Sequence, residues 1–341
     1  MKIFEKIKIE KEREIRIFGI AVLQYGKKII SGGTERYVKL FPTSFEDKTL
    51  KRILKDIPEQ YDDIWIIRTA GLGEAQLLNF AFDLTENNVC VVSHRSIYAD
   101  LFKMYSNVSF FPLNESFKSY APYLHDRNKK FHGKNIHIWH CTLKESLDWL
   151  KKHQQNDNSH LLPFIQKLWD ISAFTTTYPS FTDEFKASVL DKVSNLNTAN
   201  FVFLVPESNG TSKMPPIFWE KLTDLLSKKG YDIFVNTQSG FTKYGKSAKL
   251  TVAEASYLAS LAKSIIGLRT GFIELLAALK ERGPLYTLYT LYTPFRKIDS
   301  ENFLSTYSLK NYPFIQTNNI VELTTSQDNY EIVLDIFQKE L

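Results

Sequence analysis

The stretch Ser264-Ile265-Ile266-Gly267-Leu268-Arg269-Thr270-Gly271-Phe272-Ile273-Glu274-Leu275-Leu276 decides the expected fold. Its apolar run Ser264–Leu268 predicts a buried parallel strand, and residues 272–280 predict a helix. The turn Arg269-Thr270-Gly271 between them would place unpaired backbone N–H groups beside a fixed cation, which is the geometry of an anion site. The alternative stays open that Thr270 is only an N-cap, that Gly271 only eases the turn and that Arg269 only pairs with a surface acid.

Strands and helices alternate on both sides of this stretch. The first half predicts strands at 63–68, 88–93, 108–113 and 135–140, with helices at 48–57, 74–84, 96–105 and 143–153. The second half predicts strands at 201–205, 231–236 and 284–291, with helices at 162–171, 181–196, 215–229 and 251–263 and a terminal helix from Asn329. Strands alternating with helices of about ten residues are typical of parallel sheets. We therefore predict an α/β protein with two tandem, Rossmann-like, doubly wound domains.

Composition limits the class of protein. The chain has 341 residues, 43% hydrophobic and 24% charged, which fits a globular protein with two cores. A net charge of +5 is too mild to suggest a nucleic-acid partner. The two cysteines, Cys90 and Cys141, form no CxxC motif, and neither a signal peptide nor a membrane-spanning apolar run is evident. These features lead us to expect a cytoplasmic protein.

Basic residues gather at the N-terminus, where residues 14–25 predict a short hairpin or strand pair that Gly19 and Gly26 punctuate. The first 30 residues hold eight Lys or Arg and four Glu, interleaved with Ile and Phe. Two interpretations stay open: peripheral contact with the anionic inner face of a membrane, or a solvated charged element.

Polar residues follow four of the predicted strands, at the sheet edge where ligands of open parallel sheets bind. They are Gly71-Leu72-Gly73-Glu74, Pro206-Glu207-Ser208-Asn209, Asn236-Thr237 and Arg269-Thr270-Gly271. The glycine turn does not complete a dinucleotide fingerprint, because Gln76 stands at its third glycine position. Gly71 and Gly73 would then form a tight turn that faces a cleft between the domains.

Two glutamates have both a structural and a functional interpretation. Glu74 at a helix start could be a favourable charge at the dipole's positive end or a general base, and we expect the helix N-terminus to lower its pKa. Glu254 stands at capping-box spacing from Thr251, but it could also hold ribose hydroxyls. Among the histidines, His137 and His140 would point to opposite faces of a strand, so we expect no metal site, while His132 or His140 could line the cleft on the acceptor side.

Several segments together resemble bacterial glycosyltransferases of the GT-B architecture, in particular the heptosyltransferase-like enzymes of lipopolysaccharide and capsule assembly. They are residues 203–209, 230–236, 250–254 and 266–276. Those enzymes often carry Arg-Ser-Gly in place of Arg269-Thr270-Gly271 and Asp at the position of Glu274. Gly71-Leu72-Gly73-Glu74 resembles their Leu-Gly-Asp turn, whose acid is the proposed catalytic base.

The resemblance implies an acceptor-side domain at 1–180, a nucleotide-sugar-binding domain at 181–325 and a terminal helix at 326–341 that packs back on the first domain. It implies transfer of a sugar from a nucleotide-sugar donor to a glycan or lipid-linked acceptor without a cofactor, with Glu74 as base. The donor would be held by Glu207, Ser208, Asn209, Asn236, Glu254, Arg269, Thr270 and Gly271. A sugar-nucleotide epimerase and a non-catalytic ligand-binding protein of the same fold remain alternatives.

Overall fold

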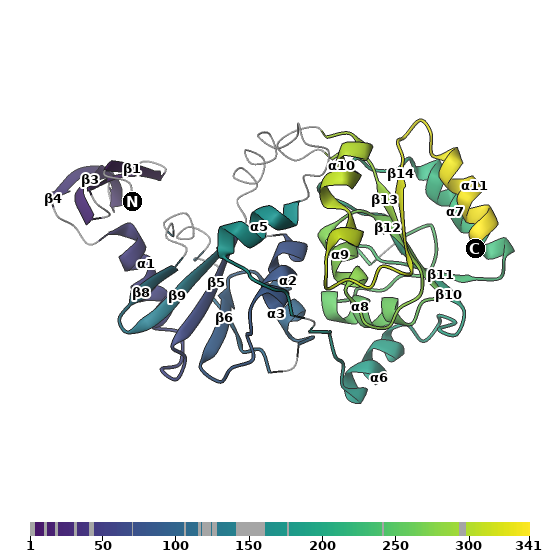
Figure 1. Ribbon diagram of the computed structural model, residues 1–341, viewed down its shortest axis with the longest axis horizontal. Coiled ribbons are helices and arrows are strands. Elements are labelled where there is room, and N and C mark those ends of the chain that lie inside the picture. Colours follow the sequence, from purple (N-terminus) through teal and green to yellow (C-terminus); the bar gives the residue numbers. More distant parts are fainter. Residues whose placement is uncertain are drawn as a thin grey trace. The chain divides into compact units, whose positions relative to one another are not determined.

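The computed structural model describes residues 4–9, 12–17, 20–30, 33–40, 44–69, 71–105, 107–114, 117, 124, 128–140, 161–175, 177–240, 242–292 and 298–341 (Figure 1). The strands of these residues form three sheets. The chain divides into two compact units, one of residues 1–69, 85–96 and 109–140 and one of residues 70–84, 97–108 and 141–341. The helix predicted at 143–153 lies outside the described residues.

The N-terminal residues form an antiparallel meander in place of the predicted strand pair. Its strands are β1 (Phe4–Ile9), β2 (Glu12–Ile17), β3 (Ile20–Ile30) and β4 (Gly33–Leu40). Each strand pairs with the next in the order β1-β2-β3-β4. The expected break at Gly26 is wrong, because Gly26 lies inside β3 and pairs with Glu12 and Tyr37.

The first unit also contains a mostly parallel sheet of order β7-β6-β5-β9-β8. The strands are β5 (Asp63–Thr69), β6 (Val89–Ser93), β7 (Phe110–Pro112), β8 (Asn128–Phe131) and β9 (Lys134–His140). Helix α1 (Phe45–Leu54) buries Leu50 and Ile53 in one core cluster with Ile64 and Ile66 of β5. The four predicted strands of this half are confirmed, and β8 adds an antiparallel edge.

The second unit is built on a fully parallel sheet of order β11-β10-β12-β13-β14. Its strands are β10 (Phe201–Val205), β11 (Asp232–Val235), β12 (Ser264–Leu268), β13 (Leu285–Tyr289) and β14 (Ile320–Thr324). Its helices include α2 (Leu72–Ala81), α3 (Ser96–Phe102), α5 (Leu161–Trp169), α6 (Asp183–Lys192), α7 (Pro216–Lys228), α8 (Val252–Ser260), α9 (Gly271–Ala277), α10 (Ser300–Tyr307) and α11 (Glu331–Glu340).

Alternate residues of these buried strands meet helices on opposite faces of the sheet. Ile266 and Leu268 of β12 share a core cluster with residues of α7 and α11. Gly267, which points to the other face, lets Ile273 of α9 approach, because an added Cβ would lie 2.7 Å from its Cδ1. A strand covered on both faces needs a continuous apolar run, which is why residues 264–268 predicted it correctly.

The terminal helix α11 begins at Glu331 and packs within the second unit. Helix α11 lies beside α7 (Figure 1), where Phe337 is fully buried and its ring centroid lies 5.3 Å from that of Tyr286. Lys229 donates to the Gln338 carbonyl, and the Tyr231 hydroxyl donates to the Leu341 carbonyl. The apolar face of α11 is therefore buried by the sheet that it directly follows.

Helix α2 and most of α3 belong to the second unit. The start of α2 packs closely against the start of α9, as described below. Among the described residues, no helix has the length and the apolar character needed to cross a membrane.

Candidate functional site

The second sheet changes winding direction between two adjacent strands, β10 and β12. From β10 the chain goes to β11 on one side, and it then returns to β12 on the other side. The loops that leave β10 and β12 therefore diverge at the carboxyl edge, which is where open α/β sheets bind ligands. The sequence-predicted residues Glu207, Ser208, Asn209, Arg269, Thr270 and Gly271 lie on these two loops.

The start of α9 is capped by its own chain. Thr270 is the N-cap, and its Oγ1 accepts a hydrogen bond from Ile273 N at 3.2 Å. Gly271 occupies the first helical position, and an added Cβ there would lie 2.8 Å from Gly73 N at the start of α2. Thr270 therefore acts as the N-cap of α9, and Gly271 is needed for a close approach between two helices as well as for the turn.

The Arg269 guanidinium is buried and paired with protein acceptors, so it does not present a set of unpaired N–H donors. Its Nη2 lies 2.9 Å from Glu274 Oε2, and only 5% of its side chain is exposed. Its Nη1 donates to the Thr270 carbonyl at 2.9 Å, and its Nε donates to the Tyr307 carbonyl at 3.3 Å. Burial alone would lower the pKa of Arg269, but the Glu274 carboxylate outweighs it and the pKa is raised. Arg269 therefore stays charged, with three of its donors directed at protein acceptors.

Glu74 occupies the third position of α2, and its carboxylate folds back over the N-cap, Gly71. A Cβ added to Gly71 would lie 2.2 Å from Glu74 Oε2. The pKa of Glu74 is raised, first by burial and second by the negative charge of Glu274, and these effects outweigh the lowering by backbone N–H groups and Arg269. The expectation that the helix N-terminus lowers the pKa of Glu74 is thus wrong in sign, because desolvation destabilises the charged carboxylate more than the helix N-terminus stabilises it.

The starts of α2 and α9 bring two carboxylates and one cation together. A Cβ added to Gly73 would lie 2.6 Å from the carboxyl carbon of Glu274, so a side chain at this position would displace the Glu274 carboxylate. Glu74, Glu274 and Arg269 interact electrostatically within this cluster. We call these three residues the carboxylate–arginine cluster. The cluster contains two acids and one base. It lies at the N-terminal ends of two helices, whose partial positive charge stabilises negative charge there.

Aromatic residues border the carboxylate–arginine cluster. Burial, and second the charge of Glu74, raise the pKa of Tyr292 to about 12. The Tyr292 ring lies 4.8 Å from the Phe303 ring and 5.7 Å from the Tyr307 ring, measured between centroids. Tyr292 therefore remains a neutral hydroxyl near Glu74 at physiological pH.

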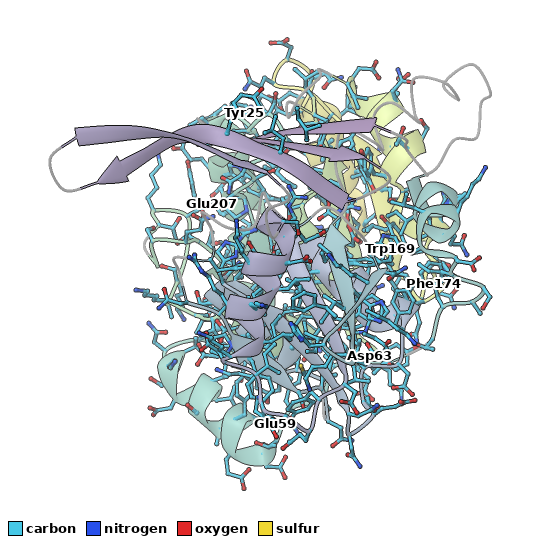
Figure 2. The ribbon with its side chains drawn as sticks, turned by 90° about the vertical axis from the view of Figure 1, so that its left-hand side faces the viewer. Tyr25, Glu59, Asp63, Trp169, Phe174 and Glu207 are labelled. Carbon is cyan, nitrogen blue, oxygen red and sulfur yellow. The ribbon has the colours of Figure 1, made fainter. Side chains whose placement is uncertain are left out.

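The loop after β10 is ordered by its own polar side chains. Glu207, labelled in Figure 2, accepts a hydrogen bond from Gln238 N at 2.9 Å and so joins this loop to the one after β11. Ser208 Oγ accepts from Gly210 N and Thr211 N. Asn209 is exposed, and Asn236 N donates to the Leu204 carbonyl. These residues lie at the carboxyl edge as predicted, and their described contacts shape the loop.

Sequence reasoning missed Thr211, which follows this loop. Thr211 is 6% exposed, and its Oγ1 is buried without a hydrogen-bond partner among the residues that the structure describes. Its backbone bridges to Tyr292, the residue that borders the carboxylate–arginine cluster. A buried hydroxyl without a partner is unfavourable, and a bound water or ligand group can supply the missing bond. Its position ten residues after the strand start carries no sequence signal that separates it from an ordinary loop threonine.

Glu254 is fully used in structural contacts. Its Oε1 lies 2.6 Å from Lys192 Nζ, and its Oε2 accepts from Thr251 N at 2.8 Å, which completes a capping box. Burial would raise its pKa, but Lys192 and the Thr251 N–H outweigh burial and the pKa is lowered. Of the two interpretations that the sequence left open, these contacts favour the structural one.

The two histidines named as acceptor-side candidates lie at opposite edges of the first sheet. His132 and Gly133, with φ of 50° and 81°, form the turn that leads into the amino end of β9. His140 ends β9 opposite Thr69, at the carboxyl edge. We therefore leave His132 out of the candidate site. In the part of the chain that the structure describes, no three His, Cys, Asp or Glu side chains are grouped to hold a metal ion.

Comparison of structures identifies the fold. No family model and no curated protein matches the sequence. Escherichia coli ADP-heptose lipopolysaccharide heptosyltransferase II is similar with a TM-score of 0.50 at 13% identity, over 78% of this chain and 92% of that one. The chain has the fold of a GT-B heptosyltransferase. A glycosyl transferase family 9 structure from Veillonella parvula matches with a TM-score of 0.47 at 11% identity, over 82% and 90% of the two chains.

Proposed function

We propose that the protein is a glycosyltransferase that moves a sugar from a nucleotide-sugar donor to a glycan or lipid-linked acceptor. The observation that carries the proposal is the meeting of Glu74 with Arg269 and Glu274 at two helix starts, next to the point where the sheet changes winding direction. The glycosyltransferase fold supports the same conclusion.

In this proposal the donor diphosphate lies at the loops after β10 and β12. Thr211 Oγ1 gives the donor a hydrogen bond that the protein leaves unmade. Arg269, which is held in place by its ion pair with Glu274, contributes positive charge to the site although its donors are already paired with protein acceptors. Fixed dipoles and a buried cation can stabilise a departing diphosphate, so we propose that no metal is required.

Glu74 acts as the general base. Sugar transfer with inversion needs a proton removed from the acceptor hydroxyl as it attacks, and a carboxylate with a raised pKa accepts that proton more readily than an ordinary one. Burial and Glu274 supply this raised pKa.

The test uses the full chain with a panel of nucleotide-sugars. Because a structural neighbour is named for ADP-heptose, that donor is tried first, followed by UDP-, GDP- and CMP-linked sugars. A transferase releases free nucleotide only when acceptor is present, whereas an epimerase converts the donor without releasing nucleotide. Glu74→Gln should slow transfer by roughly 10²–10⁴-fold with little change in donor affinity. Glu254→Gln, also at the third position of a helix, is the control that should retain transfer, and normal turnover of Glu74→Gln would refute the assignment.

A further inference from the structure

The N-terminal meander, strands β1–β4, separates its charged residues by face. Residues directly opposite in antiparallel strands share a face, and successive residues alternate between faces. Tyr25 of β3, labelled in Figure 2, lies opposite Arg13 and Val38, so these three residues mark one face. We call it the Tyr25 face, and the opposite one the Gln24 face.

The register places five basic residues and no acidic residue of the four strands on the Tyr25 face. The basic residues are Lys6, Lys8, Arg13, Lys27 and Arg36. The acidic residues of the strands, Glu5, Glu12, Glu14 and Glu35, all fall on the Gln24 face. The local charge surplus noted in the sequence is therefore concentrated on one side of the sheet.

The charged residues that lie opposite each other in neighbouring strands differ between the two faces: the pairs have opposite charge on one face and like charge on the other. On the Gln24 face, Glu5 lies opposite Arg16, and Lys28 lies opposite Glu35. On the Tyr25 face, Lys8 lies opposite Arg13, and Lys27 lies opposite Arg36. Like charges directly opposite destabilise a sheet, whereas opposite charges stabilise it. The Gln24 face thus carries charges of both signs, whereas the charged strand residues of the Tyr25 face are all basic.

Apolar residues occupy most of the rest of the Tyr25 face. They include Phe4, Ile15, Ile17, Leu23, Val38 and Leu40. Ile15, Leu23 and Tyr25 are half-buried. A face that combines aliphatic and aromatic residues with clustered cations matches the boundary between headgroups and acyl chains of an anionic bilayer. A nucleic acid would meet the cations but would leave the apolar rows without a partner.

We propose that the Tyr25 face docks the protein on an anionic lipid surface. The cations contact lipid headgroups, and the neighbouring apolar rows enter the interface. This inference is independent of the proposed function, since lipid binding is measured without donor or acceptor.

The first experiment is co-sedimentation of the full chain with vesicles of phosphatidylglycerol and phosphatidylcholine, against vesicles of phosphatidylcholine alone. The triple variant Lys8→Gln, Arg13→Gln, Lys27→Gln should lower the partition coefficient by roughly tenfold or more. The control Arg16→Gln, Lys28→Gln, Lys39→Gln removes the same charge from the Gln24 face and should bind like the unmodified protein. Equal loss in both variants, or no preference for anionic vesicles, would overturn the proposal.

We expect the test variant to fold, because its three changes relieve the two like-charge pairs of the Tyr25 face. A second measurement places a reporter on each face through Tyr25→Trp and Gln24→Trp. Brominated lipids should quench the added fluorescence of Tyr25→Trp and leave that of Gln24→Trp unchanged. Equal quenching, or tight binding to duplex DNA with no quenching of either, rules out docking through the Tyr25 face.

Discussion

Arg269, which precedes the N-cap of α9, forms an ion pair with Glu274 in the first turn of that helix, with 2.9 Å between Nη2 and Oε2 and side chains only 5% and 12% exposed. The pair fixes the cation of the candidate site and also places Glu274 where its charge raises the pKa of Glu74. One contact thus links the stability of the second unit to the acid–base character of the site.

Removing one partner of this buried pair should be costly. We expect Arg269→Ala to lower the free energy of unfolding by about 3–5 kcal/mol, because Glu274 would stay buried without its cation. Lys221→Ala is the control, since the Lys221–Glu331 pair is 45% and 59% exposed and should contribute less than about 1 kcal/mol. Urea denaturation measures both, and equal effects would contradict the burial of the Arg269 pair.

The glycine contacts between α2 and α9 should tolerate no side chain. In Gly271→Ala the new Cβ would meet the Gly73 backbone at 2.8 Å, so a helix must move, at about 1–3 kcal/mol. In Gly71→Ala the nearest atom is Glu74 Oε2, the end of a flexible side chain that can rotate away. We therefore expect a clear loss of thermal stability only for Gly271→Ala, and matching melting curves would argue against close helix packing.

Two glutamates at the same helix position should respond to pH with opposite sign. The pKa of Glu74 is raised above its ordinary 4.5, so its favourable contribution exists at low pH and is lost as pH rises through the folded pKa. The pKa of Glu254 is lowered, so its contribution exists above 4.5 and is lost as pH falls. Near neutral pH, Glu74→Gln should raise the melting temperature and Glu254→Gln should lower it. Both differences should shrink in acid, and melting temperatures across a pH series test this.

Thr211→Val should separate stability from ligand binding. It removes a buried hydroxyl without a partner, so stability should stay constant or rise by about 1–2 kcal/mol. Donor affinity should fall, because the donor loses that hydrogen bond. Thr287→Val is the matched control, since Thr287 Oγ1 is also buried without a partner, inside β13. Thermal shift with the bound nucleotide-sugar should change for Thr211→Val alone, and unchanged affinity would remove Thr211 from the site.

The sequence by itself determined the elements that depend on local pattern. Strands buried on both faces appear as continuous apolar runs, so β10 and β12 were predictable to within a residue. Thr251 and Glu254 form the predicted capping box, because both partners lie within one helical turn. The Arg269-Thr270-Gly271 turn likewise placed the candidate site at the correct sheet edge.

Only the tertiary structure decided what these groups do there. Glu74 and Glu274 are distant in sequence, and only the packing of α2 on α9 buries them together and reverses the expected sign of the Glu74 pKa shift. The surroundings of Thr211 depend on the backbone bridge to Tyr292, which is distant in sequence, and the separation of charge in the meander depends on strand register. Desolvation depends on which elements cover a residue, and register depends on how neighbouring strands pair. No local sequence pattern encodes either of them.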